Sequence, residues 1–174
     1  LRYGDKKGST PTLKIPTNNW GYDLLQAPTN APKKDKLRPT TNNAHASLFA
    51  YMPYRVSRLV LEAPEEVLAG KRLYYSIQVK TYDALPSDHL FAVRLLDSLG
   101  HSIPHYERTL EFHEGDEMAR GYIPLAFNDP LSTYTLEIRD LITGITATHP
   151  IEIVSEISED SEKNKRSPKS INKK

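Results

Sequence analysis

The chain of 174 residues carries 23 basic and 22 acidic side chains, so its net charge of +1 produces no overall field that favours DNA, RNA or acidic lipid. No apolar stretch approaches the roughly 18 residues that a membrane-spanning helix needs, so we expect no membrane insertion. Cysteine is absent, which excludes disulfides, thiol nucleophiles and cysteine-ligated zinc or iron–sulfur centres.

The N-terminal region, residues 1–53, is rich in Pro, Thr, Asn and Lys and has only short apolar patches. Short strands are predicted at 13–15 and 22–25, and a longer one at 44–52, which Pro53 ends. Two interpretations stay open: the closing strands of a preceding β-domain, or an ordered arm that packs on the residues that follow. The chain begins with Leu-Arg-Tyr-Gly and without a signal segment, so we expect it to be a piece of a longer protein.

Residues 54–154 consist of short segments in which apolar and polar side chains alternate, separated by turn residues. Alternation with a period of two predicts strands with one buried and one solvated face. The predicted strands are 56–62, 73–81, 89–97, 103–112, 118–125, 132–139 and 145–154. Residues 63–71 are predicted to turn the chain. Seven strands in about 100 residues are typical of an all-β, immunoglobulin-like antiparallel β-sandwich.

The apolar residues within each predicted strand share one parity, so they are expected to face the core. This set comprises Leu73, Tyr75, Ile77, Val79, Phe91, Val93, Leu95, Leu136, Ile138, Ile151 and Ile153. Pro104 favours an edge position for the strand at 103–112, because proline cannot donate to a ladder. Tyr134 is predicted to be a tyrosine corner whose hydroxyl bonds the backbone of the loop at 128–130.

The densest group of potential metal ligands lies at residues 111–117, where Glu, His and Asp gather around Gly115. Charged residues are also what a solvated hairpin turn selects, and we favour that interpretation. A calcium site formed by Asp129 and Asp140 is a weaker alternative to two ordinary turns. No nucleophile elbow, P-loop, dinucleotide fingerprint or metalloprotease motif occurs, so we predict no catalytic residue, cofactor or metal ligand.

Ten tyrosines and one tryptophan suggest a second kind of site, because sugar rings stack on flat exposed aromatic side chains. The parity of Tyr75 and Tyr134 places them in the core. Trp20, Tyr74 and Tyr106 are the candidate ligand-contact aromatics, provided that they are exposed on one face.

The C-terminal segment, residues 155–174, consists mostly of Ser, Glu, Asp, Lys, Asn and Arg. Such a segment cannot bury enough apolar surface to offset the entropy of ordering, so a disordered tail is predicted. Its basic run at 163–166 is nearly neutralised by the acidic residues before it, which favours a solvated chain end over a polyanion site.

Five short stretches carry a resemblance to a known kind of module. They are Met-Pro-Tyr-Arg-Val at 52–56, Leu-Glu-Ala-Pro at 61–64, Leu-Ala-Phe-Asn-Asp-Pro at 125–130, Thr-Tyr-Thr-Leu at 133–136 and Arg-Asp-Leu-Ile-Thr-Gly at 139–144. In this order they resemble C-terminal immunoglobulin-like, macroglobulin-type β-sandwich modules of large bacterial secreted or envelope proteins, some with glycosidase-like upstream domains. The resemblance covers 44–154, and Ser132 stands where such strands commonly have glycine. It marks turns and core positions, so no catalytic residue carries over.

These observations together predict three parts: residues 1–53, a sandwich at 54–154 and a tail at 155–174. The expected function is that of a non-catalytic spacer, packing or interaction module of a larger exported bacterial protein, with an extracellular or cell-envelope location. Its expected partners are the other domains of that protein. The alternative is a carbohydrate-binding accessory module of a glycoside hydrolase.

Overall fold

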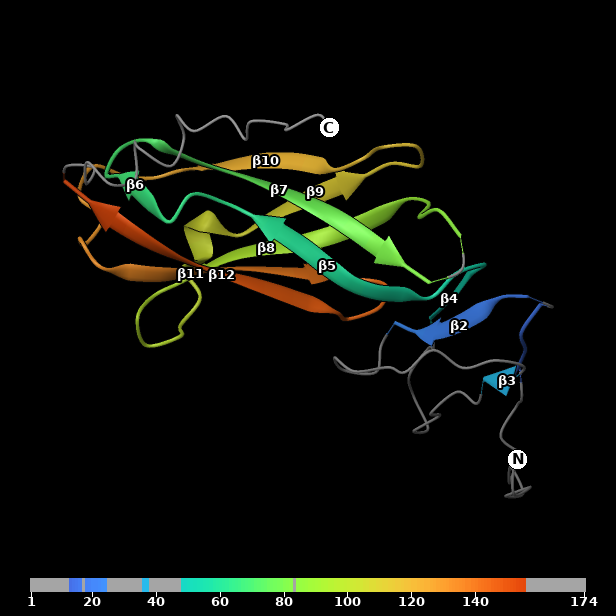
Figure 1. Ribbon diagram of the computed structural model, residues 1–174. Helices are drawn as coiled ribbons and strands as arrows, with labels where there is room; N and C mark the ends of the chain where they lie inside the picture. Colours follow the sequence, from blue (N-terminus) through green and yellow to red (C-terminus); the bar gives the residue numbers. More distant parts are fainter. Residues whose placement is uncertain (1–12, 17, 25–35, 38–47, 83, 156–174) are drawn as a thin grey trace, which may run out of the picture.

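The computed structural model describes residues 13–16, 18–24, 36–37, 48–82 and 84–155 (Figure 1). These residues form an all-β protein with one short 3₁₀ turn. The elements are β1 (Leu13–Lys14), β2 (Trp20–Asp23), β3 (Lys36–Leu37), β4 (Phe49–Met52), β5 (Val56–Glu62), β6 (Glu66–Leu68), β7 (Arg72–Thr81), β8 (His89–Leu96), η1 (Pro104–Tyr106), β9 (Arg108–Phe112), β10 (Ala119–Pro124), β11 (Thr133–Asp140) and β12 (Thr146–Val154). Among the described residues there is no helix long and apolar enough to span a membrane.

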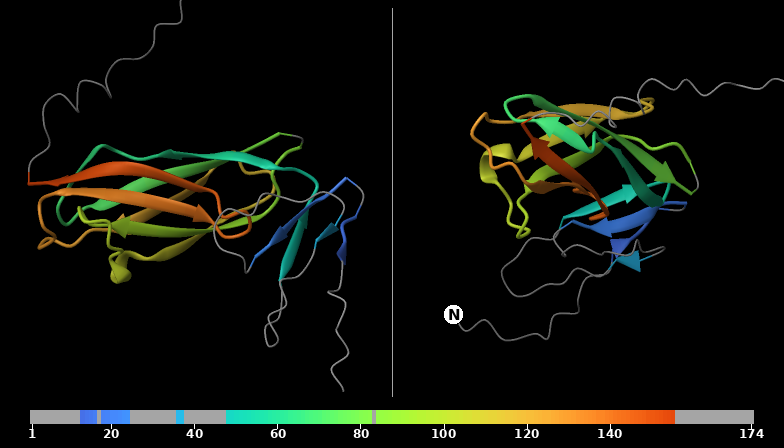
Figure 2. Two further views of the ribbon diagram at one scale, coloured as in Figure 1. Left: turned by 90° about the horizontal axis from the view of Figure 1, so that it is seen from below. Right: turned by 60° about the vertical axis from the view of Figure 1, so that its left-hand side comes forward.

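Two larger sheets form the body of the molecule. The three-stranded sheet has the order β10-β7-β5, and the five-stranded sheet has the order β6-β12-β11-β8-β9. Neighbouring strands are antiparallel, except that β6 runs parallel to β12. The two sheets lie in separate layers, which the turned views show from the side (Figure 2).

The core lies between these two layers. Every residue that strand parity predicts to face inward is buried, including Leu73, Phe91 and Leu136, which have no exposed surface. The prediction is confirmed because successive side chains of a strand point to opposite faces of the sheet, and in these strands the face that carries the apolar side chains is the one that packs in the core. Six of the seven predicted strands occur, with bounds that agree to within one residue.

The remaining predicted strand, 103–112, is wrong at its beginning. Residues Pro104–Tyr106 form the 3₁₀ turn, and the strand starts only at Arg108. Proline fixes its own φ and suits the first position of such a turn. The edge position is confirmed, because β9 is the last strand of the five-stranded sheet.

A second difference concerns residues 63–71, which were predicted to be only a turn. The chain leaves the three-stranded sheet after Glu62, passes Pro64 and forms β6 on the edge of the other sheet, where Val67 pairs with Ile153. A three-residue strand is too short to show a period in the sequence. This crossing leaves the first residues of β7 without a β5 neighbour.

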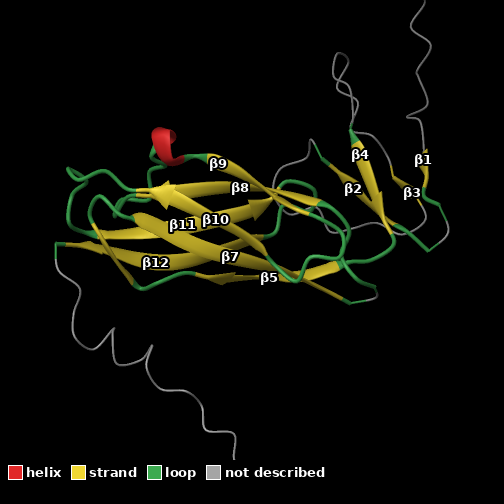
Figure 3. Ribbon diagram, turned by 90° about the horizontal axis from the view of Figure 1, so that it is seen from above, coloured by secondary structure: helices red, strands yellow, loops and turns green. Residues whose placement is uncertain are grey.

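Two small sheets, β1-β3 and β2-β4, stand at one end of the body (Figure 3). Tyr22 of β2 and Met52 of β4 are buried and belong to the same hydrophobic core cluster as the residues of the two larger sheets. β1 covers the first two residues of the strand predicted at 13–15, and β2 begins two residues before the one predicted at 22–25. β4 covers the last four residues of the strand predicted at 44–52; residue 25 and residues 44–47 lie outside the described residues. The predicted tail at 155–174 lies outside the described residues apart from Ser155.

Candidate functional site

A buried polar network lies where β2 and β4 meet the body of the molecule. Tyr54 follows β4 and has no exposed surface. Its Oη lies 2.8 Å from the Oγ of Ser87 and 3.0 Å from the Nε2 of His89. The backbone N–H of Ser87 also donates to this oxygen, at 2.8 Å. One hydroxyl group therefore joins the β4–β5 corner to the β7–β8 loop and the start of β8.

The other side of the His89 ring contacts the end of β11. Its Nδ1 lies 3.1 Å from the Oδ2 of Asp140, and both side chains are completely buried. A carboxylate only accepts hydrogen bonds, so Nδ1 carries the hydrogen of this contact. Asp140 also accepts from the Oγ1 of Thr143, at 2.6 Å, and from the N–H of Ile142, at 3.0 Å. Asp140 thus opens the hairpin turn that the sequence predicted at this position.

The His89 ring is held between apolar neighbours as well. It stacks on Phe91 with the ring planes at 5° and meets the edge of Phe112. Burial of an ionisable pair is costly unless every polar atom has a partner, and here both ring nitrogens and both Asp140 oxygens have one. The side chains of His89 and Asp140 have no exposed surface that a substrate could reach. The hydrogen bonds of the network therefore serve to hold the loops in fixed positions.

A cation–π contact reinforces the same junction at the surface. The guanidinium carbon of Arg55 lies 5.2 Å from the ring centre of Trp20 and 4.3 Å from that of Tyr82. Tyr22 of β2 is buried, and this burial raises its pKa to about 12. Trp20 is half-buried. This candidate ligand-contact aromatic therefore packs against the hydrophobic core and does not form an open platform.

Tyr106 does not lie on the surface either, which corrects the expectation that it contacts a ligand. It is 3% exposed, its hydroxyl donates to Asp129, and the N–H of Ala126 donates to that hydroxyl at 2.8 Å. Burial and the hydrogen bond to Asp129 raise the pKa of Tyr106 to about 12. The 3₁₀ turn, which the sequence analysis missed, points this ring inward.

Tyr74 is the one candidate aromatic with an open face. It is 58% exposed on β7 and pairs across the ladder with Tyr122 of β10, which is 44% exposed. The two ring centres are 5.8 Å apart, and the Arg72 guanidinium lies 4.6 Å from the Tyr122 ring centre. The sequence analysis does not name Tyr122 as a candidate. Its position could have been predicted, because Tyr122 and Arg120 alternate along the strand with the buried Ile123 and therefore lie on the outer face.

A groove of about 670 Å³ runs beside Tyr74. It exists because β5 leaves the sheet: the last β5–β7 pair is Glu62 with Ser76, so no β5 residue stands next to Tyr74. The side chains that the groove offers to a ligand include Glu62, Lys71, Arg72, Tyr74 and Arg120. Apolar residues of the β5–β6 connection, among them Pro64, line it as well.

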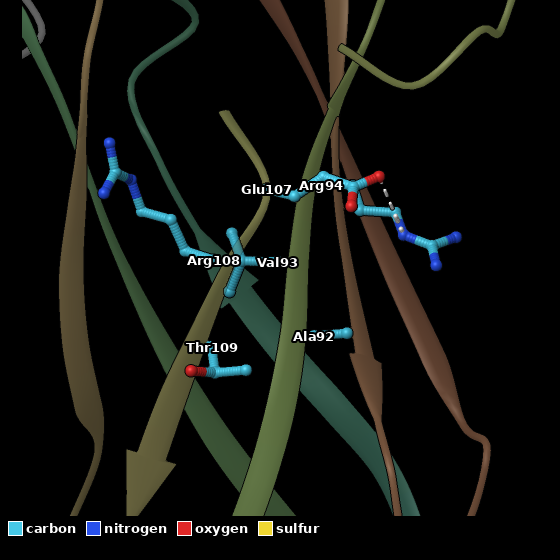
Figure 4. A pocket seen from close by; sticks show the side chains of 6 residues that line it. All are labelled: Ala92, Val93, Arg94, Glu107, Arg108 and Thr109. Atoms are coloured by element: carbon cyan, nitrogen blue, oxygen red, sulfur yellow. Dashed lines mark ion pairs between the residues drawn. The ribbon is translucent and has the colours of Figure 1, made fainter. Parts of the chain in front are cut away.

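A second hollow, of about 610 Å³, lies along β8 and β9, and the pair Arg94 and Glu107 lies among its lining residues (Figure 4). Arg94 and Glu107 approach each other to 3.8 Å on one side of the strands, whereas Arg108 points away from this pair. This hollow offers no convergent set of side chains.

The acidic cluster at 111–117 forms an exposed turn. His113 lies 3.5 Å from Glu111 and 3.8 Å from Asp88, and all three side chains are largely in solvent. Asp129 lies in the turn before β11, whereas Asp140 is the last residue of β11, and the two carboxylates have separate partners, which argues against a shared calcium site. Within the described part of the chain, no group of three or more His, Asp or Glu residues is placed to hold a metal ion.

Comparisons of the sequence with protein-family models and with curated proteins find no match.

Proposed function

We propose that residues 54–154 are an immunoglobulin-like β-sandwich. The order of the sheets supports this assignment: β5, β7 and β10 take the positions of strands A, B and E, and β8, β11 and β12 those of C, F and G. In this scheme β9 is an added strand beside C, and β6 is the second half of strand A. The hydrogen bond from the Tyr134 hydroxyl to the Pro130 carbonyl, at 3.0 Å, has the form of a tyrosine corner at the start of strand F.

We further propose that this sandwich is a non-catalytic packing module of a larger exported bacterial protein, and that it holds the preceding segment in a fixed position. The observation that carries this function is the burial of Tyr22 of β2 and Met52 of β4 in the same core cluster as the residues of the sandwich. The buried Tyr54–His89–Asp140 network supports it, because it fixes the corner that directly follows β4. The bacterial and exported context rests on the sequence resemblance.

Native-state hydrogen exchange tests the packing function. The amides of β2 and β4 are expected to open with the same free energy as those of β7 and β11, because they share one core. Tyr54→Phe removes the central hydroxyl and is expected to increase exchange in β2 and β4, whereas Tyr122→Phe, on the outer face, is the matched control. Rapid exchange of β2 and β4 in the unmodified protein, beside a protected sandwich, would contradict the proposal.

A second candidate function is that of a carbohydrate-binding accessory module. The observation that favours it is the exposed pair Tyr74 and Tyr122 beside a groove, because tyrosine offers both an apolar ring face and a polar edge. This function uses the outer face of the three-stranded sheet, so it is compatible with packing at the β2–β4 end.

A further inference from the structure

We propose that the groove beside Tyr74 binds an acidic carbohydrate, a sugar chain that bears carboxylate groups. This inference rests on the second candidate function and specifies its ligand class. The groove has a size typical of small-ligand sites, which are about 300–1,000 Å³. Its position follows from the fold, because the departure of β5 after Glu62 opens the outer face of β7 next to the Tyr74 ring.

The charges that line the groove favour an anionic ligand. Lys71, Arg72 and Arg120 are exposed there, against the two carboxylates of Glu62 and Glu66. Glu66 already interacts with another group of the protein. Ser76 of β7 pairs with Arg120 of β10 on one side and with Glu62 of β5 on the other, so these three residues form one row across the sheet. The pair Tyr74 and Tyr122 forms the neighbouring row on the same face. Guanidinium groups bind carboxylates in a bidentate manner, which adds orientation as well as energy.

The tyrosine rings favour a sugar over a simple anion. A pyranose ring has an apolar face of C–H groups and an edge of hydroxyls, and it can place that face on Tyr74 while its carboxylate meets an arginine. Arg72 is already oriented by its contact with the Tyr122 ring. A side chain ordered before binding loses less entropy when the ligand arrives.

Titration calorimetry on the full chain with three probes tests the proposal. The probes are a trisaccharide of galacturonic acid, a neutral trisaccharide of glucose, and a short poly-glutamate peptide of matched charge. We expect one molecule of the acidic trisaccharide to bind per chain, at least tenfold more tightly than either other probe. Binding is also expected to weaken as salt increases, because exposed charges are screened.

Variants locate the site. Tyr74→Ala and Arg120→Gln are each expected to weaken binding of the acidic trisaccharide at least tenfold. The matched controls are Tyr51→Ala, an exposed tyrosine of β4, and Arg108→Gln, an exposed arginine of β9, which are expected to leave binding unchanged. All four positions are exposed, and an unchanged thermal transition verifies that each variant is folded.

The outcomes separate this inference from the function on which it rests. Tight binding of the neutral trisaccharide alone would overturn the acidic ligand class and leave carbohydrate binding standing. Equal binding of poly-glutamate would show that charge alone is recognised and would overturn the inference. Binding of no trisaccharide would overturn both the inference and the second candidate function. Binding that survives Tyr74→Ala and Arg120→Gln would exclude this groove.

Discussion

The Nδ1 of His89 lies 3.1 Å from a carboxylate oxygen of Asp140, and neither side chain has any exposed surface. Asp140→Ala leaves the buried Nδ1 of His89 without its hydrogen-bond partner, so it is expected to reduce the free energy of unfolding by about 1–3 kcal/mol. The control is Glu137→Gln, because Glu137 meets Arg94 at 3.9 Å near the surface and such pairs contribute about 0–1 kcal/mol. Urea denaturation measures both. Equal losses in the two variants would mean that the buried network adds nothing.

Tyr134→Phe removes one hydrogen bond and leaves the ring in place. The Tyr134 hydroxyl donates to the carbonyl of Pro130, and the ring is buried at the start of β11. We expect the free energy of unfolding to fall by about 0.5–1.5 kcal/mol, the usual net contribution of one hydrogen bond. Tyr122→Phe, on an exposed ring, is expected to change it by less. A loss in Tyr134→Phe no larger than that of the control would contradict the tyrosine-corner role.

Leu136→Ala tests the core between the two sheets. Leu136 has no exposed surface, and truncation of a buried leucine leaves a cavity that costs about 2–5 kcal/mol. Leu85 is 88% exposed and provides the matched truncation outside the core. The difference between the two variants in chemical denaturation reports the burial of Leu136. A negligible difference would contradict its place in the core.

The sequence predicted the two-sheet core well because that information is local. In Leu73–Val79 and Phe91–Leu95, every second side chain is apolar, and the alternation alone tells which face is dry. The short strand β6 escaped prediction because three residues cannot display a period. The 3₁₀ turn at Pro104–Tyr106 escaped it because Tyr106 shares the parity of Leu110 and Phe112, which favours one continuous strand.

The candidate sites could not be predicted in the same way because they depend on contacts that are distant in sequence. His89 and Asp140 are 51 positions apart, and each alone is an ordinary residue at the end of a strand. The groove beside Tyr74 depends on where β5 leaves the sheet, which no property of Tyr74 reveals. Tyr74 was identified as a candidate from its type and parity, whereas its neighbours Arg72 and Arg120 became visible only through the register of β7 and β10.

Stability is expected to fall at alkaline pH because burial raises the pKa of Tyr22 and Tyr106 strongly, and that of Tyr54 and Tyr75 in the same direction. Burial raises the pKa of Tyr22 and of Tyr106 from 10.0 to about 12, with Asp129 contributing at Tyr106. Below pH 10 both tyrosines are protonated in the folded and unfolded states, so their contribution is fully present. Between pH 10 and 12 the unfolded chain loses protons first, so the free energy of unfolding falls as pH rises through this range.

Phenylalanine variants assign this alkaline loss to the two tyrosines. Denaturant midpoints measured between pH 9 and 12 are expected to fall less steeply in Tyr106→Phe than in the unmodified protein, and least steeply in Tyr22→Phe/Tyr106→Phe. A phenylalanine has no proton to lose, so its contribution to the pH dependence disappears. A slope that is unchanged in the double variant would show that other groups govern the alkaline transition.

A substitution at Gly70 tests whether backbone strain or contact with the Phe127 ring limits which residues this position accepts. Its φ of 75° lies in the left-handed region, and an added Cβ would approach the Phe127 ring to 2.4 Å. Phe127 is 85% exposed, so its ring has solvent to move into and the close approach is relieved at little cost. The cost of holding an alanine in the left-handed backbone conformation remains. We therefore expect Gly70→Ala to lower the free energy of unfolding by about 1–2 kcal/mol.

Gly100 is the matched control for Gly70, because its φ is 83° and nothing lies within 4 Å of an added Cβ. Gly100→Ala is therefore expected to cost as much as Gly70→Ala, since both variants carry the same backbone strain. Phe127→Ala is expected to leave the cost of Gly70→Ala unchanged, which a double-mutant cycle measures. A larger loss in Gly70→Ala that Phe127→Ala relieves would show that the Phe127 ring is held in place despite its exposure.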